Sequence, residues 1–162
     1  MQASIAPLRA TDLRAVLALN NAHAAETSEL TLAELKALVG TAFSAAGVEG
    51  GAQAFLIACD ETAAYDSPNY LWFRDRYPRF VYVDRVIVAP EARGRGLARL
   101  LYEDLFEKAG ASGRALVACE VNLVPPNPAS DAFHAALSFE EAGRAEIHGG
   151  AKTVRYLKKT LA

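Results

Sequence analysis

Apolar residues recur along the chain with two different periods. Residues 96–109 carry leucines three and four positions apart, which predicts an amphipathic helix that ends at Gly110. Residues 80–88 (FVYVDRVIV) are instead dense in β-branched and aromatic side chains, as in a strand buried on both faces, and residues 115–121 form another apolar run of strand length. Strand, tight turn, helix and strand in this order predict a parallel β-α-β unit with a right-handed crossover, in which 80–88 is the central strand.

Helices and mostly antiparallel strands are expected on either side of this unit. Thr31 and Glu34 have the spacing of a capping box, and the sequence Glu49-Gly50-Gly51 is typical of a hairpin turn. The expected elements are a strand at 5–8, helices after Thr11 and Thr31, strands at 42–48 and 53–59, the central unit, a helix from Asn127 to Leu137, and strands at about 139–147 and 152–158. The pattern predicts a mixed α/β fold formed by one domain over residues 1–162.

Composition narrows the class of protein. With 17 Lys plus Arg against 19 Asp plus Glu, and a formal charge of −2, the chain of 162 residues suits one compact soluble domain and lacks the basic excess of a nucleic-acid binder. No run approaches the ~18 apolar residues of a membrane span, and the first residues have no signal-peptide pattern. We therefore expect a cytoplasmic protein with no nucleic-acid or membrane partner. Cys59 and Cys119 lie in apolar runs and are expected to be buried and reduced, with no metal site.

The segment 86–98 (VIVAPEARGRGLA) carries the most informative chemistry. It leads from the central strand into a helix, whose first turn exposes unpaired N–H groups and a partial positive charge. Gly94 and Gly96 allow this backbone to approach a ligand without interference from a Cβ, and Arg93 and Arg95 add positive charge. The pattern is neither a Walker loop nor the G-x-G-x-x-G dinucleotide fingerprint. A pyrophosphate-binding turn and a purely structural glycine turn both remain open from the residues alone.

Two motifs nevertheless resemble those of the GNAT acyltransferases. Residues 93–98, preceded by a V-x-x-P approach that ends at Pro90, resemble the family's [Q/R]-x-x-G-x-[G/A] acetyl-CoA loop. A second stretch follows the family's N-x-x-A-x-x-F-Y-x-x-x-G-F helix through Asn127, Ser130, Phe133, His134, Leu137 and Phe139. The order of elements is also the family's, so the resemblance covers roughly residues 5–160. It implies a mostly antiparallel sheet with helices on both faces and splayed central strands.

The resemblance implies acetyl-CoA as co-substrate and assigns residues to it by position. In the family the pantetheine arm pairs like an extra strand with the central strand, where a backbone N–H polarises the thioester oxygen; the matching residues here are Val86, Ile87 and Val88. The pyrophosphate cradle is matched by Arg93, Gly94, Arg95, Gly96, Leu97 and Ala98. Asn127 matches a residue that often touches the pantetheine or the thiol end.

Two positions depart from the second motif. Ser138 replaces the usual Gly, and His134 replaces the Tyr that in many members protonates the departing thiolate. His134 could act as an imidazolium donor or as a proton relay, because its ordinary pKa lies near neutral pH. Alternatively, His134 is a half-exposed helix residue and solvent protonates the thiolate.

A general base is also needed, because an acceptor ammonium must lose a proton before it attacks. Glu120 is the first candidate and Asp84 the second, since carboxylates inside apolar strands are costly unless they are used or paired. Either carboxylate could instead be structural, in an ion pair with Arg85 or with a neighbouring strand.

The segment 60–79 is a long insertion rich in aromatic and acidic residues. Its aromatic side chains are candidates for the acceptor pocket, because aromatics with carboxylates suit a cationic or aromatic amine. The candidates are Tyr65, Tyr70, Trp72 and Phe73. The same composition suits a packed lid or the contact of a possible homodimer.

The resemblance predicts an acetyl-CoA-dependent N-acetyltransferase that acts on the amine of a small molecule or amino acid by direct attack. One alternative is a catalytically weak CoA-binding module that serves as a sensor or interaction partner, motivated by the replaced Tyr. Another is a protein or peptide N-acetyltransferase, for which an open acidic groove is expected in place of a closed aromatic pocket.

Overall fold

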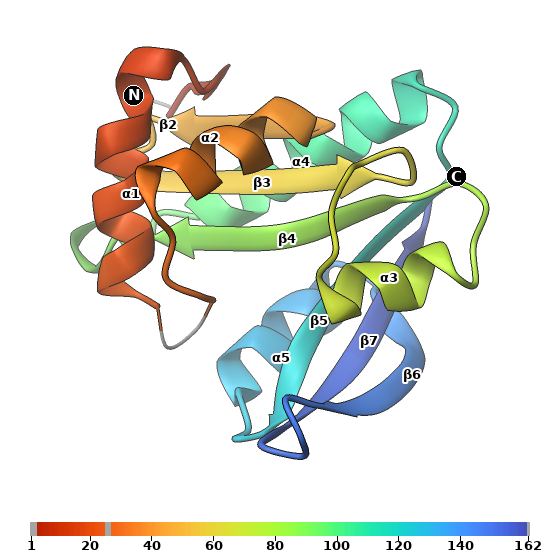
Figure 1. The fold of residues 1–162 in the computed structure, drawn as a ribbon. Coiled ribbons are helices and arrows are strands. Elements are labelled where there is room, and N and C mark those ends of the chain that lie inside the picture. Colours follow the sequence, from red (N-terminus) through yellow and green to blue (C-terminus); the bar gives the residue numbers. More distant parts are fainter. Residues whose placement is uncertain (1–2, 25–26, 162) are drawn as a thin grey trace.

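A seven-stranded mixed sheet forms the centre of the computed structural model, which describes residues 3–24 and 27–161 (Figure 1). The strand order is β1-β2-β3-β4-β5-β7-β6, and β4 and β5 form the parallel pair. The strands are β1 (Ile5–Pro7), β2 (Ser44–Val48), β3 (Ala54–Asp60), β4 (Val81–Val88), β5 (Leu116–Val124), β6 (Glu140–Ile147) and β7 (Lys152–Thr160). The predicted fold class, with one parallel β-α-β unit in a mostly antiparallel sheet, is confirmed.

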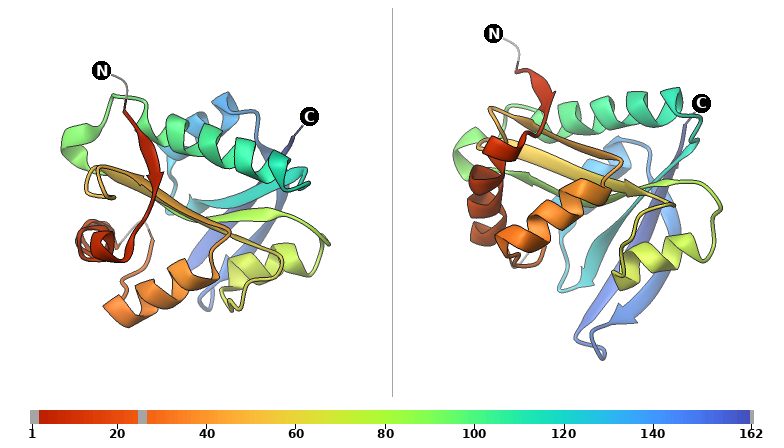
Figure 2. Two further views of the ribbon diagram at one scale, coloured as in Figure 1. Left: turned by 90° about the horizontal axis from the view of Figure 1, so that it is seen from above. Right: turned by 45° about the horizontal axis from the view of Figure 1, so that its top comes forward.

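Helices cover both faces of this sheet, as Figure 2 shows. The α-helices are α1 (Leu13–Ala22), α2 (Leu32–Thr41), α3 (Pro68–Arg74), α4 (Leu97–Ala111) and α5 (Pro128–Ala136). Leu101 and Leu105 of α4 pack into the core on one face, whereas Leu35 of α2 and Phe73 of α3 pack into the core on the other. Burial of apolar surface on both sides holds the central strands in place. In the described part of the chain, no helix combines the length and apolar character that a bilayer crossing requires.

The local signals for the helix ends are largely confirmed. Thr31 and Glu34 form the reciprocal capping box, with the Glu34 amide donating to Thr31 Oγ1 and the Thr31 amide donating to Glu34 Oε1. The expected end of α4 at Gly110 is wrong, because the helix continues to Ala111 and Gly113 takes the left-handed conformation after it, at φ +80°. The insertion also contains α3, with Pro68 in its first turn, which the hydrophobic pattern did not predict.

Candidate active site

The two central strands separate after a very short contact. Val81 pairs with Val117 and Tyr82 with Ala118, and no further pair joins β4 to β5 among the described residues. On the other side of β4, Val83 and Arg85 pair with consecutive residues of β3, so Asp84 between them is the extra residue of a β-bulge. Bulges bend a strand, and Figure 1 shows β4 and β5 diverging beyond this point.

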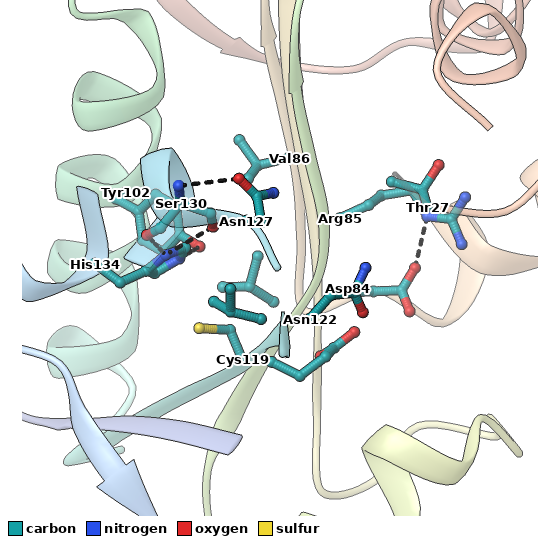
Figure 3. Close-up of a pocket in the computed structure, with 13 residues that line it drawn as sticks. Thr27, Asp84, Arg85, Val86, Tyr102, Cys119, Asn122, Asn127, Ser130 and His134 are labelled. Atoms are coloured by element: carbon teal, nitrogen blue, oxygen red, sulfur yellow. Dashed lines mark hydrogen bonds and ion pairs between the residues drawn. The ribbon is translucent and has the colours of Figure 1, made fainter. Parts of the chain in front are cut away.

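A cavity of about 230 Å³ fills the gap between the separated strands (Figure 3). Figure 3 places Tyr102, Ser130 and His134 on one side of it, and Asp84 and Arg85 on the other. The lining residues are Thr27, Val83, Asp84, Arg85, Val86, Tyr102, Cys119, Glu120, Val121, Asn122, Asn127, Ser130 and His134. The gap is therefore bounded by β4, β5, α4 and α5, the elements of the predicted β-α-β unit and the helix after it.

A second cavity, of about 430 Å³, lies against the first. It is bounded by the α1–α2 connection, the segment before α3 and the turn between β6 and β7. The two cavities share Thr27, Asp84, Arg85, Glu120 and Asn122. Both carboxylates predicted as candidate bases thus lie where a ligand in one cavity meets a ligand in the other.

Glu120 projects from β5 into this junction, beside the side chains of Tyr82 and Asn69. The hydroxyl of Tyr82 donates to Glu120 Oε2 at 2.7 Å. Burial raises the pKa of Glu120 from 4.5 to about 8, because desolvation outweighs the stabilisation that the Tyr82 hydrogen bond gives to the charged form. Glu120 has no ion pair among the residues that the structure describes. A carboxyl group with this pKa can take up a proton near neutral pH.

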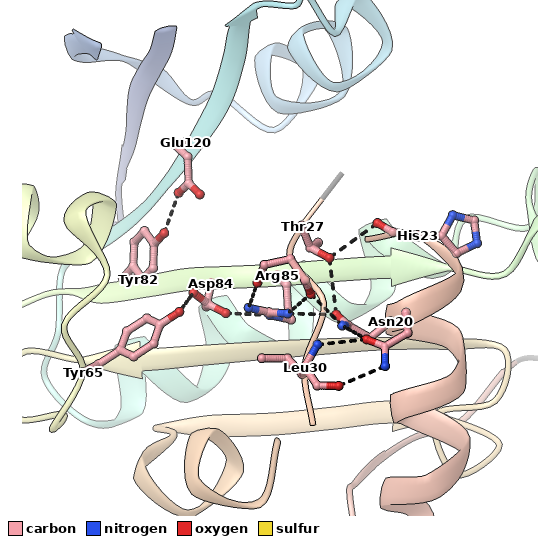
Figure 4. Close-up of polar contacts among 11 residues, drawn as sticks. Asn20, His23, Thr27, Leu30, Tyr65, Tyr82, Asp84, Arg85 and Glu120 are labelled. Carbon is pink, nitrogen blue, oxygen red and sulfur yellow. Dashed lines mark hydrogen bonds and ion pairs between the residues drawn. The ribbon is translucent and has the colours of Figure 1, made fainter. Parts of the chain in front are cut away.

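Asp84 has a different environment on the opposite strand (Figure 4). The hydroxyl of Tyr65 donates to Asp84 Oδ1 at 2.5 Å, and Arg85 Nε donates to Asp84 Oδ2 at 2.7 Å. The Asp84 and Arg85 side chains are each only 5% exposed, so this is the structural ion pair that the sequence left open. Both oxygens of the buried carboxylate thereby have a hydrogen-bond partner.

Arg85 also ties the α1–α2 connection to β4. Its Nη1 donates to Asn20 Oδ1 at 2.8 Å and its Nη2 donates to Ser28 Oγ at 3.2 Å. Asn21 of α1 in turn bonds the Leu30 backbone through both its amide nitrogen and its oxygen. Figure 4 shows this chain of contacts from β4 to α1. One wall of the larger cavity is therefore held by the same ion pair that fixes Asp84.

His134 is buried, with 5% of its surface exposed, so the expectation of a half-exposed residue is wrong. Its Nδ1 lies 2.8 Å from the Ser130 carbonyl oxygen, which can only accept, so Nδ1 carries a proton. Its Nε2 lies 2.8 Å from the Tyr102 hydroxyl and accepts from it. Burial lowers the pKa of His134, which favours this neutral form. The imidazole is thus held in one tautomer without a proton on the nitrogen that faces Tyr102.

The turn before α4 has the open backbone that an anion site requires. Gly94 and Gly96 have φ of +80° and +72°, and a Cβ at either position would meet no atom within 4 Å. Within the described residues, the amides of positions 94–99 donate no hydrogen bond, and the first helical bond runs from Leu100 N to Gly96 O. Arg93 and Arg95 are exposed beside them, and Arg95 Nη1 donates to Gln53 Oε1. The protein's own side chains do not fill this bend.

The elements that form this site lie within a segment that matches a known family of sequences. The sequence model of the acetyltransferase (GNAT) family matches residues 21–139, which include β4, the glycine turn, α4, β5 and α5. The chain belongs to the GNAT acetyltransferase family. A search of the curated proteins gave no match.

Solved structures similar to this GNAT acetyltransferase share its fold over nearly the whole chain. An N-acetyltransferase from Staphylococcus aureus Mu50 is 20% identical, with 100% of both chains covered and a TM-score of 0.74. Ard1 from Thermoplasma volcanium is 13% identical, with 100% of this chain and 99% of that chain covered and a TM-score of 0.78. A phosphinothricin acetyltransferase from Sinorhizobium meliloti, in complex with acetyl-CoA, is 22% identical, with 100% and 90% covered and a TM-score of 0.73.

In this family member, the remaining residues predicted to bind acetyl-CoA lie in different environments. Val86 and Asn127 line the smaller cavity, whereas Ile87 is buried, Val88 is half-buried, and neither is among the residues that line the described cavities. Leu97 is buried in the core and Ala98 is half-buried, so these two can reach a ligand through their backbone amides.

The aromatic insertion contributes less to the cavities than expected. Tyr65 lines the larger cavity, but Tyr70 and Phe73 are fully buried in the core, where apolar neighbours surround their rings. Trp72 stacks on Tyr156 with ring centroids 4.3 Å apart. Tyr70, Trp72 and Phe73 are therefore packing residues of α3, and they are not among the residues that line the two cavities.

Several lining residues were not predicted from the sequence. Tyr82 and Tyr102 place hydroxyl groups at the junction and beside His134, and both lie in segments whose apolar pattern made them core candidates. A phenol inside an otherwise apolar strand or helix face is a usable signal, because a buried hydroxyl needs a partner. The contribution of Thr27 and Ser28 had no comparable signal, since it depends on the position of a connection.

Proposed function

We propose that the protein is an acetyl-CoA-dependent N-acetyltransferase that acts on a small-molecule amine or amino acid by direct attack. The observation that carries this proposal is the position of Glu120, at the junction of two cavities and with a pKa suited to proton transfer. The smaller cavity adjoins the free edge of β4 and would take the thioester end of acetyl-CoA. The larger cavity would take the amine.

The residues present fit acetyl-CoA. The amides of positions 94–99 are unpaired among the described residues, and the space beside Gly94 and Gly96 is open. These amides can bind the diphosphate, with Arg93 and Arg95 adding positive charge. Beyond Tyr82, β4 has no strand partner on its β5 side among the described residues, so its backbone is available to an extended pantetheine arm. When bound, acetyl-CoA supplies an activated thioester. The protein has to position the amine and remove its proton.

Glu120 is the group that we assign to proton removal. Asp84 already accepts a hydrogen bond on each of its two oxygens, from Tyr65 and from Arg85, so neither oxygen is free to contact an acceptor amine. Glu120 accepts from the uncharged Tyr82 hydroxyl and has no ion pair among the described residues, and its raised pKa lies closer to that of an amine. We assign protonation of the departing thiolate to solvent, because His134 has no proton on Nε2 and burial lowers its pKa.

Replacement of Glu120 by Gln tests this assignment. The variant keeps the size of the side chain and should lower kcat by about 100-fold or more, the usual range for loss of a general base, while the acetyl-CoA affinity stays unchanged. Thiol release measures turnover and isothermal titration measures affinity. Glu107→Gln, on an exposed position of α4 outside both cavities, is the matched control. Equal turnover in wild type and Glu120→Gln would contradict the role of Glu120.

The pH dependence gives a second test of the same group. Glu120 acts as a base in its deprotonated form, so kcat/KM should rise with pH up to about 8 and then level off. Because the folded pKa lies above the ordinary 4.5, folding is linked to proton binding, and the free energy of unfolding should fall as the pH rises from about 4.5 to about 8. In thermal melts across this range, Glu120→Gln should lack that part of the fall.

Peptide acetylation is the second candidate, and the lining of the larger cavity favours it. The expected closed aromatic pocket is not present among the described residues, and the lining is largely polar and acidic. A panel that contains small amines, amino acids and a short peptide with a free N-terminus distinguishes the two. Acetyl-CoA binding without thiol release from any member would instead indicate a CoA-binding module.

A further inference from the structure

The charge of the larger cavity differs between its inner end and its mouth. At the inner end, Asp84 is compensated by the guanidinium of Arg85 at 2.7 Å. Burial raises the pKa of Glu120 to about 8, so this carboxyl group carries less negative charge near neutral pH than an ordinary glutamate. The end that holds the reacting amine therefore carries less negative charge than its two carboxyl groups alone would give.

The mouth carries an excess of negative charge. Glu29, Glu34 and Asp66 are exposed there, and Lys152 is the one Lys or Arg side chain among the described lining residues at this end. Three carboxylates against one ammonium leave a formal charge of −2, as large as that of the whole chain. Glu29 and Asp66 form no ion pair within residues 3–24 and 27–161. Their charge is available to a ligand in the cavity.

Asn122 offers an independent polar contact between these two ends. It lies on β5 and lines both cavities, and its half-buried side chain has no hydrogen-bond partner in the described part of the protein. A half-buried amide without a partner inside a cavity indicates a place where a ligand or water completes its hydrogen bonds. The path from Glu120 to the mouth is thus polar rather than apolar.

We propose that the acceptor is a small diamine, which places one amine beside Glu120 and its second, cationic amine at the mouth near Glu29 and Asp66. This inference rests on the proposed N-acetyltransferase function and narrows its substrate class. In the reaction, the inner ammonium loses one proton to the deprotonated form of Glu120 and its nitrogen forms the C–N bond. The C–S bond breaks, the nitrogen loses its second proton to give the amide, and the thiolate takes a proton from solvent. The second ammonium stays charged throughout. A free carboxylate at the same place would be repelled, so amino acids are poorer acceptors.

Three probes with the same four-carbon chain test this inference. Each carries one reactive amine, and they differ at the far end: 1-aminobutane has a methyl group, 1,4-diaminobutane an ammonium and 4-aminobutyrate a carboxylate. In assays of thiol release, kcat/KM should be at least about fivefold higher for the diamine than for the monoamine, in line with two exposed charge contacts, and lowest for the amino acid. High salt should reduce the diamine's advantage, because the mouth is exposed to solvent.

A double variant locates the effect on the protein. Glu29→Gln combined with Asp66→Asn should lower the ratio of diamine to monoamine kcat/KM by about fivefold, whereas Glu107→Gln should leave this ratio unchanged. All three positions are exposed, so these variants should fold. Isothermal titration with acetyl-CoA provides a check that the cofactor site is intact.

The outcomes separate the inference from the function on which it rests. Equal or higher kcat/KM for the monoamine or the amino acid, or an unchanged ratio in the double variant, would overturn the diamine assignment and leave N-acetyltransfer standing. A peptide with a free N-terminus that is preferred over all three probes would also overturn it, in favour of peptide acetylation. Acetyl-CoA binding with no thiol release for any acceptor would overturn both.

Discussion

Two glycine turns of this protein have similar backbones and very different surroundings. One joins β2 to β3, where Gly50 and Gly51 have φ of +63° and +83°. The other precedes α4, where Gly94 and Gly96 have φ of +80° and +72°. A Cβ on Gly51 would lie 2.4 Å from Val16 Cγ2, whereas a Cβ on Gly96 would meet nothing within 4 Å.

The backbone amides show the same contrast. In the hairpin, the Gly51 amide donates to the Val48 carbonyl at 3.1 Å, so the turn satisfies its own polar groups. Before α4, the described residues supply no acceptor to the amides of positions 94–99. Left-handed conformation alone therefore does not identify a ligand site. Open space together with unsatisfied amides is the combination that distinguishes the turn before α4.

Among the variants that test this contrast, Gly96→Pro should have the largest effect. Proline fixes φ near −65° and has no amide hydrogen, so the variant removes both the left-handed bend and one of the donors. Its acetyl-CoA affinity should fall by about 100-fold or more, a loss on the order of 3 kcal/mol. Isothermal titration measures the affinity, and circular dichroism verifies that the variant is folded. Unchanged affinity in a folded variant would contradict the assignment of the turn before α4, and not the β2–β3 turn, as a ligand site.

Gly51→Ala should give a smaller effect of a different kind. The new methyl group would overlap Val16, and alanine is strained at φ +83°, so we expect a loss of about 2–3 kcal/mol in the free energy of unfolding. Urea denaturation measures this loss. The folded fraction should bind acetyl-CoA with wild-type affinity, because this turn has no part in the site. A loss of affinity without a loss of stability would show that the roles are reversed.

Gly96→Ala is the matched substitution at the open turn and should have the smallest effect on stability. No atom lies near the new Cβ, so only the left-handed conformation costs energy, about 1 kcal/mol. The methyl group would occupy space needed for close approach of the diphosphate, and acetyl-CoA affinity should fall by about tenfold. Gly51→Ala should therefore lose more stability and keep its affinity for acetyl-CoA, whereas Gly96→Ala should lose affinity and little stability. The same result for both variants would contradict the comparison.

The sequence alone predicted the elements whose signals are local. The capping box at Thr31, the strand at β4 and the helix after the glycine turn all depend on residues within a few positions of one another. The helix α3 was missed because it has only seven residues, and the continuous apolar run from Tyr70 to Phe73 obscures the three-residue spacing of its buried side chains. The end of α4 was misplaced because two glycines compete, and only Gly113 adopts positive φ.

In the candidate site, too, local signals were predicted from the sequence and long-range contacts were not. The sequence identified Glu120 and Asp84 because they are carboxylates inside apolar strands. Their different roles depend on hydrogen-bond partners that are far away in the sequence. Tyr82 is 38 positions from Glu120, and Tyr65 is 19 positions from Asp84. The bulge that turns Asp84 out of register is a property of the pairing between β3 and β4. Such long-range pairings are not encoded in periodicity or local spacing.

The most direct test of the proposed site is a titration of isotopically labelled protein with acetyl-CoA, followed through backbone amide resonances. The amides of residues 94–99 should show the largest shifts, toward the values of strongly hydrogen-bonded groups, while those of Gly50 and Gly51 should stay unchanged. Saturable binding that shifts other amides and leaves residues 94–99 unaffected would contradict the assignment of this turn to the diphosphate.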